Sequence, residues 1–242
     1  MQRSWYPDPI YDPATSNITC SWNGSAGPDA FHAPIAAGDN ITAHWDNEYD
    51  WYNPNLPFPY ACNATSITNK YDCAGNHWFH GIGPILAYMA DCGDDCSVVD
   101  PSTLNWFKIA EAVNKPGGLI RDASSWYQSR LVAHSNVAPG WTVTIPQELK
   151  PGNYLIRHEM MYLFGSPTQI YVNCAQLAVT SQGNRIPSSE YLVKFPGAYR
   201  MDGAYYSWPR CLTMTAYLVI YEQSRAFSHF QIPNKPTLRT KL

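Results

Sequence analysis

Residues 141–146 read Trp-Thr-Val-Thr-Ile-Pro, and this short run decides the class of fold. The apolar side chains of Trp141, Val143 and Ile145 alternate with two threonines, so they fall on one side of an extended chain. Pro146 ends the run, because proline has no backbone N–H to give to a neighbouring strand. The pattern predicts a β-strand that buries one face and exposes the other.

Other parts of the chain have the same character. Four further runs read as strands: 40–45, 84–90, 153–163 and 169–180. Turn-forming residues separate the runs at 37–39, 116–118, 139–140 and 150–152. No long amphipathic helix competes with these strands. Short strands at this spacing predict an all-β protein, an antiparallel β-sandwich in one domain that extends over residues 1–208.

Two regions break the strand pattern. Residues 46–79 contain no clear strand but many aromatic residues, and so long a loop in a compact domain is usually functional. The alternative is a flap that only covers a sheet and is held by a bridge between Cys62 and Cys73. Residues 209–242 differ in character from the rest of the chain and end in a polar, proline-containing stretch. We expect this C-terminal tail to pack poorly.

The charge balance argues against polyanionic partners. The 242 residues carry 16 Lys and Arg against 19 Asp and Glu, a net charge of -3, and only 14% are charged. No basic run or stripe is present, and neutralising the phosphates of nucleic acids or lipids needs clustered cations. The longest apolar stretch, Leu212 to Tyr221, is about half the roughly 20 residues that span a bilayer. We expect a neutral partner, with no nucleic acid and no membrane.

The cysteines and the glycosylation sequons indicate an oxidising compartment. None of the seven cysteines forms the CxxC pair of a structural zinc site, so disulfides are expected, with one cysteine left over. Asn-x-Ser/Thr sequons occur at Asn17, Asn23, Asn40 and Asn63. The first residues lack the apolar core of a signal peptide. We expect a secreted, extracellular glycoprotein whose export signal is removed or missing from this version.

An ordered set of segments resembles the fungal lytic polysaccharide monooxygenases of auxiliary activity family 9, formerly glycoside hydrolase family 61. The segments extend from residue 17 to about residue 200 in the family's order, and the set is specific although no single run is. The matching runs are Asn17-Ile-Thr-Cys20, 35–45, 83–92, 104–109, Trp141-Thr-Val-Thr-Ile-Pro146, Pro151-Gly-Asn-Tyr-Leu-Ile-Arg-His-Glu159, Gln169-Ile-Tyr-Val-Asn-Cys-Ala-Gln-Leu177 and Phe195-Pro-Gly-Ala-Tyr199.

The resemblance carries specific expectations. It implies an immunoglobulin-like or fibronectin-like β-sandwich whose flat surface site holds one copper ion and cleaves cellulose or a related β-glucan oxidatively. It also implies a supply of electrons from a small reductant or a redox protein, and a monomeric state. Two disulfides follow from it, Cys20 to Cys174 and Cys92 to Cys96.

In this family copper is held by a brace, in which the amino group and imidazole of an N-terminal histidine chelate the ion. A second histidine supplies the opposite nitrogen, and a tyrosine oxygen is axial. Nitrogen donors suit both oxidation states of copper and leave positions open for an oxygen cosubstrate. This sequence begins with methionine, and Arg3 aligns beyond the family's first strand. We therefore expect the chain as given to be impaired in catalysis.

The second histidine ligand falls in a segment that departs from the family. Family members carry His-x-Gly-Pro, whereas this chain reads His80-Gly-Ile-Gly-Pro84, with one residue inserted. His80 can still reach the metal if the loop bulges, and His77 is the substitute. Either histidine can also be an ordinary loop residue.

Gln169 and Tyr171 match the family's Gln-x-Tyr, and residues two apart on a strand share a face. By resemblance Tyr171 is the axial ligand and Gln169 orients bound oxygen; otherwise they are a core tyrosine and an exposed glutamine. The family's second-shell histidine falls six residues after His158, where this chain has Phe164, which cannot transfer a proton. His158 itself is expected to be a hydrogen-bonded structural residue.

Tyr199 matches a tyrosine of the family's flat binding face. Aromatic rings stack on the C–H faces of sugar rings, so Tyr199 is the predicted substrate-binding residue. Tyr49, Trp51 or Tyr52 from the long loop could join it in one plane.

Three other functions compete with this interpretation of the sequence. A non-catalytic polysaccharide-binding or cell-wall relative without the brace is the main alternative, and Phe164 and the His80 insertion favour it. A zinc protein using Cys73, His77 and His80 would need a fourth ligand such as Cys62. A glycoside hydrolase would need paired carboxylates, and its candidates look like solvated surface residues: Asp91, Asp94, Asp95 and Asp100.

Overall fold

The computed structural model of the protein describes residues 3, 8–22, 24–27, 30–45, 78, 80–132, 140–165 and 167–199. The strands in this part of the chain are β1 (Ala33–Ala36), β2 (Asn40–His44), β3 (Ile85–Gly93), β4 (Trp106–Ala112), β5 (Gly140–Thr144), β6 (Gly152–Tyr162), β7 (Gln169–Thr180) and β8 (Leu192–Val193). The helical segments are one turn of α-helix, α1 (Asn17–Cys20), and the 3₁₀ turns η3 (Pro101–Thr103), η4 (Ala123–Ser125), η5 (Tyr127–Arg130) and η6 (Ser189–Tyr191).

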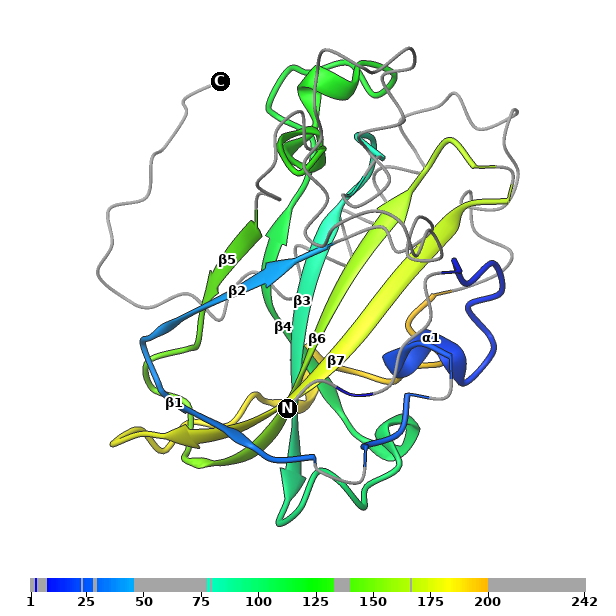
Figure 1. Cartoon of the computed structure of the whole chain (residues 1–242). Helices are drawn as coiled ribbons and strands as arrows, with labels where there is room; N and C mark the ends of the chain where they lie inside the picture. The colour runs from blue at the N-terminus through cyan, green and yellow to red at the C-terminus, as the bar shows by residue number, and fades with distance from the viewer. Residues whose placement is uncertain are drawn as a thin grey trace, which may run out of the picture.

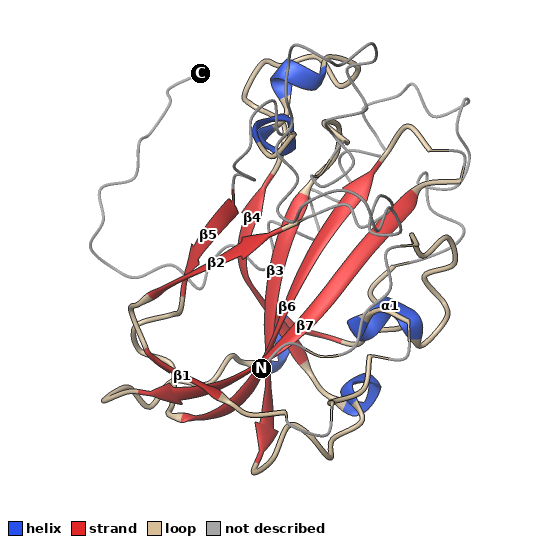
Figure 2. Cartoon of the chain, viewed as in Figure 1, coloured by secondary structure: helices blue, strands red, loops and turns tan. Residues whose placement is uncertain are grey.

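The described strands form two sheets, as a β-sandwich requires. Six strands make one sheet in the order β1-β7-β6-β3-β4-β8, and β2 pairs with β5 in the second (Figures 1 and 2). All five runs that the alternation pattern predicted are strands, with ends within a few residues of the prediction. The predicted boundary at residue 208, the tail beyond it and the proposed bridge between Cys62 and Cys73 lie outside the described residues.

One pairing departs from the antiparallel expectation. The edge strand β1 runs parallel to β7, with Ala33 opposite Leu177 and Ala36 opposite Thr180. No hairpin joins these two strands, which lie far apart in the sequence. The geometry of a tight turn therefore does not fix their relative direction.

The large sheet is buried on both faces, and successive residues of its long strands point to opposite sides. On one face, Leu155 and Val172 pack with Ile18 of α1. On the other face, Ile156 and Met89 pack with Val143 of β5. Figure 1 shows the same division, with α1 on one side of the long strands and β2 and β5 on the other. Both clusters remove apolar area from water, which is the main stabilising term of the fold.

A buried ion pair lies within the α1 side of the core. Arg157 and Glu159 on β6 are both fully buried, and Arg157 Nη1 donates to Glu159 Oε2. The remaining guanidinium donors bind α1, where Nη2 donates to the Ile18 carbonyl at 2.8 Å and Nε to the Thr19 carbonyl at 2.8 Å. The ring of Phe195 covers the guanidinium at 3.9 Å from its centroid. Arg157 therefore joins three separate parts of the chain.

Two disulfides that the resemblance implied are present and restrict the unfolded chain very differently. Cys20–Cys174 joins α1 to β7 across 154 residues, whereas Cys92–Cys96 closes a turn of four. In the chain-entropy account, the long loop stabilises the fold by about 5 kcal/mol and the short one by about 2 kcal/mol. The long-range bridge is the one that holds the two ends of the domain together.

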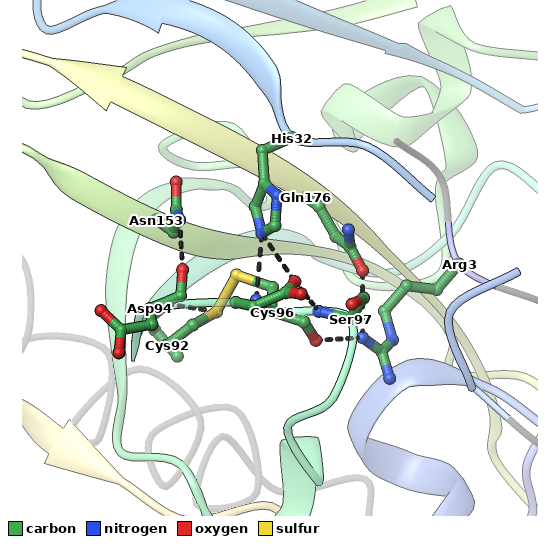
Figure 3. Close-up of polar contacts among 10 residues, drawn as sticks. Arg3, His32, Cys92, Asp94, Cys96, Ser97, Asn153 and Gln176 are labelled. Carbon is green, nitrogen blue, oxygen red and sulfur yellow. Dashed lines mark hydrogen bonds and ion pairs between the residues drawn. A yellow bond between two sulfur atoms is a disulfide. The ribbon is translucent and has the colours of Figure 1, made fainter. Parts of the chain in front are cut away.

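A polar cluster fixes the turn that follows β3 (Figure 3). The backbone N–H of Cys96 donates to His32 Nε2 at 3.0 Å, and the Cys96 carbonyl accepts from Arg3 Nη1 at 2.8 Å. The same nitrogen of Arg3 donates to Gln176 Oε1 of β7 at 3.3 Å. Burial lowers the pKa of Arg3, and Asp100 opposes that shift. The cluster thus ties the N-terminal segment to β7 and to the end of β3.

Candidate functional site

His80 and Tyr171 meet in the structure although they are 91 residues apart in the sequence. His80 Nε2 lies 3.1 Å from the hydroxyl of Tyr171. The Tyr171 hydroxyl donates its one proton to Gln169 Oε1 at 2.6 Å, so its lone pairs remain for the histidine side. Gln169 and Tyr171 are the first and third residues of β7 and share one face of it. The structure therefore brings three of the predicted site residues together.

The inserted residue before β3 is accommodated by local backbone contacts. Ile82 accepts a hydrogen bond from the N–H of Leu163 at 3.2 Å, which holds the loop against the end of β6. Gly83 adopts a φ of +146°, and a Cβ there would lie 1.9 Å from the carbonyl oxygen of Met161. Only glycine fits this close approach. The loop thus holds the extra residue while His80 still reaches Tyr171.

Aromatic rings surround the imidazole of His80. The ring of Tyr162 stacks on it, with the centroids 4.0 Å apart and the planes 9° from parallel. Trp78 meets His80 edge-on at 5.3 Å and Tyr171 at 4.8 Å. Burial lowers the pKa of His80 to about 4, against a smaller opposing effect of its hydrogen bond to Gln169. At neutral pH the imidazole is uncharged, which is the form that binds a metal.

Tyr162 and Trp78 were missed as site residues. Tyr162 pairs with Gln169 in the register of β6 and β7, so it lies on the same face as Tyr171. Strand alternation alone could have found Tyr162. Trp78 is one of many aromatic residues in its loop, and no pattern singles it out.

Other predicted residues are placed elsewhere or lie outside the described part. Tyr199 donates its hydroxyl to Glu159 Oε2 at 2.8 Å, and Glu159 faces the side of the large sheet opposite to Tyr171. Burial and the Glu159 carboxylate raise the pKa of Tyr199 well above its ordinary value. The structure therefore does not bring Tyr199 together with His80 and Tyr171. Four other candidates are outside the described residues: Tyr49, Trp51, Tyr52 and His77.

The neighbouring strand contributes a second buried histidine. His158 on β6 meets Trp45 edge-on at 6.0 Å and Trp141 at 6.3 Å. Its Nε2 has no hydrogen-bond partner, contrary to the expectation of a hydrogen-bonded structural residue. Burial lowers the pKa of His158 to about 4. Protonating this ring would place a charge among apolar rings, which is costly.

We expect His158 to make the protein sensitive to acid. The pKa of His158 is about 6.5 in the unfolded chain and about 4 in the folded protein. Between these two pH values the unfolded state therefore binds one more proton than the folded state. Stability should fall by about 3 kcal/mol as the pH drops through this window, and His80 should add to the loss in the same direction. Urea unfolding between pH 4 and pH 7 measures it. His158→Gln should flatten the profile, and an unchanged slope would contradict the assignment.

The carboxylates beside the Cys92–Cys96 turn are exposed, as expected, and accept hydrogen bonds from backbone N–H groups. Asp91 accepts from the N–H of Gly93 at 2.8 Å, and Asp95 accepts from the N–H of Ser97 at 2.8 Å. The bonds from Ser97 lower the pKa of Asp95. These carboxylates therefore stabilise local turns, which is a structural role.

The alternative zinc site falls mostly outside the described part of the chain. Cys62, Cys73 and His77 lie outside the described residues. Over the described ranges, no group of three or more His, Cys, Asp or Glu side chains is placed to hold a metal ion. None of the helices in the same ranges is long and apolar enough to cross a membrane.

Comparison with known proteins gives one consistent result. A family model described as Auxiliary Activity family 9 (formerly GH61) matches residues 1–209. AA9 family lytic polysaccharide monooxygenase B of Heterobasidion irregulare is 37% identical over 205 residues, which are 84% of this chain and 70% of that protein. The monooxygenase-like protein CEL1 of Agaricus bisporus is 34% identical over 82% of this chain, which spans only 52% of its length.

Solved structures agree with these sequence matches. The crystal structure titled HiLPMO9B superposes with a TM-score of 0.65 at 36% identity, covering 85% of this chain and 77% of that one. A cellulose-active polysaccharide monooxygenase from M. thermophila superposes with a TM-score of 0.64 at 29% identity, covering 82% and 75%. The similarity extends over most of the chain.

Proposed function

The chain belongs to Auxiliary Activity family 9, and on that premise we propose that it is a copper-dependent monooxygenase that cleaves cellulose or a related β-glucan oxidatively. Its similarity to proteins named lytic polysaccharide monooxygenases supports oxidative cleavage of polysaccharides in general. The observation that carries the copper proposal is the 3.1 Å approach of His80 Nε2 to the Tyr171 hydroxyl.

The donor set fits copper as far as the described residues go. His80 offers a neutral imidazole nitrogen, and Tyr171 offers a phenol oxygen whose proton is already directed to Gln169. Imidazole is a preferred copper ligand, and the phenol oxygen would add a weaker donor beside it. Copper, when bound, would supply the one-electron chemistry that the use of dioxygen requires.

The surrounding residues have separate roles in this proposal. Tyr162 stacks on His80 and Trp78 meets it edge-on, so the imidazole is held in one orientation and partly shielded from water. Gln169 accepts the hydroxyl proton of Tyr171 and also hydrogen-bonds the imidazole of His80, so it links the two donors. Positioning of this kind reduces the reorganisation that the reaction would otherwise require.

Substrate and location are proposed from two further observations. One solved relative is described as cellulose-active, which supports a β-glucan as the partner of this chain. Two disulfides, Cys20–Cys174 and Cys92–Cys96, are typical of an extracellular protein. The enzyme would act as a secreted monomer and receive electrons from a small reductant or a redox protein.

The release of oxidised oligosaccharides from cellulose tests the proposed activity. The purified chain is incubated with amorphous cellulose, copper and ascorbate. The soluble products are separated by chromatography, and their masses are measured by mass spectrometry. Because the family's brace uses a terminal histidine and residue 1 here is methionine, a form extended to begin with histidine is assayed in parallel. We expect oxidised products that require both copper and reductant, in greater amount from the extended form.

The second candidate function is non-catalytic binding of polysaccharide on the same fold. Phe164, in the loop between β6 and β7, stands where the family has a proton-transferring histidine, and its side chain has no exchangeable proton. If both forms bind cellulose in sedimentation assays but neither gives oxidised products, the binding protein is the correct description and the enzyme proposal fails.

A further inference from the structure

The exposed face of β2 carries a glycosylation sequon in a suitable geometry. Asn40, Ile41 and Thr42 form the sequon, and the strand alternation buries the isoleucine toward the core while Asn40 and Thr42 face solvent. The two residues that the modification needs therefore project from the same, outer side of the strand.

The amide of Asn40 is oriented by the neighbouring strand. Thr144 on β5 is directly opposite Asn40, and its hydroxyl donates to Asn40 Oδ1 at 2.7 Å. Thr42, the next residue on the exposed face of β2, shares a hydrogen bond of 2.7 Å with Thr142 of β5. Since the carbonyl oxygen of the amide is bound to β5, the nitrogen Nδ2 is the end of the side chain left to solvent.

The other described sequon has a different environment. Asn17 belongs to α1 and lines a cavity of about 440 Å³ together with Arg3 and Asp100. Its partner Thr19 is buried, and the Thr19 hydroxyl donates to the Phe195 carbonyl at 2.8 Å. A glycan on Asn17 would have to fit into or over this cavity, whereas a glycan on Asn40 displaces nothing. The acceptor residues of the other two sequons, Asn23 and Asn63, lie outside the described residues.

We propose that Asn40 is the site of an N-linked oligosaccharide in the secreted protein. The donor is an oligosaccharide carried on a polyprenyl diphosphate. A bond forms between Asn40 Nδ2 and the anomeric carbon of the first N-acetylglucosamine, while the bond from that carbon to the diphosphate oxygen breaks. Nδ2 loses one proton, the polyprenyl diphosphate leaves, and nothing is oxidised or reduced.

A glycan at this position leaves the candidate metal site open. Asn40 begins β2, and His44 at the other end is four residues away, about 13 Å along the strand. Trp45, next in the chain, packs into the cluster that contains Trp78 and touches Tyr171. The oligosaccharide would thus lie at the end of β2 distant from this cluster. It would also cover an edge, because among the described strands β2 pairs only with β5, and exposed edges promote association.

The proposal rests on passage through a secretory pathway, so the test supplies one. The chain is expressed in a eukaryotic host behind a heterologous export signal, and the occupancy of each sequon is measured by mass spectrometry of peptides. Most molecules should carry a glycan on Asn40. Thr42→Ala and Asn40→Gln should abolish it, whereas Thr42→Ser, which keeps the sequon intact, should retain it as the matched control.

An unmodified Asn40 in secreted protein would overturn the proposal, and so would a glycan on Asn40 that survives Thr42→Ala. Copper binding is titrated on the same preparations before and after enzymatic removal of the glycan. Equal affinity is expected, because the glycan lies away from His80. If Asn40 is glycosylated but the protein binds no copper, the proposed function is wrong and the glycan assignment is still supported.

Discussion

Replacing Arg157 with methionine is expected to lower the free energy of unfolding by about 3–5 kcal/mol, the cost of removing one partner of a buried ion pair. The change leaves the carboxylate of Glu159 buried without its cation and deprives the Ile18 and Thr19 carbonyls of their donors. Methionine fills much of the arginine's volume, so the loss would reflect unpaired polar groups more than an empty space. Denaturant unfolding at neutral pH measures it.

The matched control for this change is an exposed ion pair. Arg185 Nε lies 2.9 Å from Glu148 Oε2, and both side chains are about half exposed. Arg185→Met should cost no more than about 1 kcal/mol, because solvent screens the pair. A double change, Arg157→Met with Glu159→Leu, should recover part of the larger loss, since no buried charge remains. If Arg157→Met and Arg185→Met lower the free energy of unfolding equally, the buried ion pair stabilises the fold no more than the exposed one.

The second large effect concerns copper. His80→Ala removes the only imidazole nitrogen that contacts Tyr171 among the described residues. Loss of an outer-shell partner of a metal ligand typically costs 10–100-fold in affinity, so loss of the ligand itself should cost at least about 100-fold. Calorimetric titration with Cu(II) gives the affinity, and electron paramagnetic resonance of the bound ion reports the change in its nitrogen ligands.

Two variants make the copper result interpretable. His32→Ala removes a histidine that instead accepts from the N–H of Cys96, beyond the opposite end of β3, and it should leave the affinity unchanged. Tyr171→Phe deletes only the phenol oxygen, so it should alter the spectrum more than the affinity. If His80→Ala and His32→Ala bind copper equally well, then His80 is not a ligand and the copper proposal loses its support.

Alternation of apolar residues was enough to predict the central strands and to put Gln169 and Tyr171 on one face of β7. It could not predict that His80 reaches Tyr171, because that contact depends on a loop whose path is fixed by Gly83 and the carbonyl of Met161. Nor could it predict where Tyr199 points. A tyrosine in a turn suits a sugar-binding face and a buried carboxylate equally well, and only the fold shows that Glu159 is its partner.

The short strands were also beyond the reach of the pattern. β1 has four residues and β8 has two, so neither offers enough alternation to distinguish a strand from a loop. The sequence pattern also gives the wrong environment for the charged residues Arg157 and Glu159. Two charged residues at alternate positions suggest a solvated face, whereas here that face is covered by α1 and Phe195.

The unequal burial of the two disulfides determines which of them a reducing agent would break first. Cys20 and Cys174 are almost inaccessible, at 2% and 1% exposure, whereas Cys92 is partly exposed. Thiol exchange requires a thiolate to reach a sulfur atom, so glutathione or dithiothreitol would meet Cys92 first. A sulfhydryl reagent would therefore open the small turn after β3 long before it severed the link between α1 and β7.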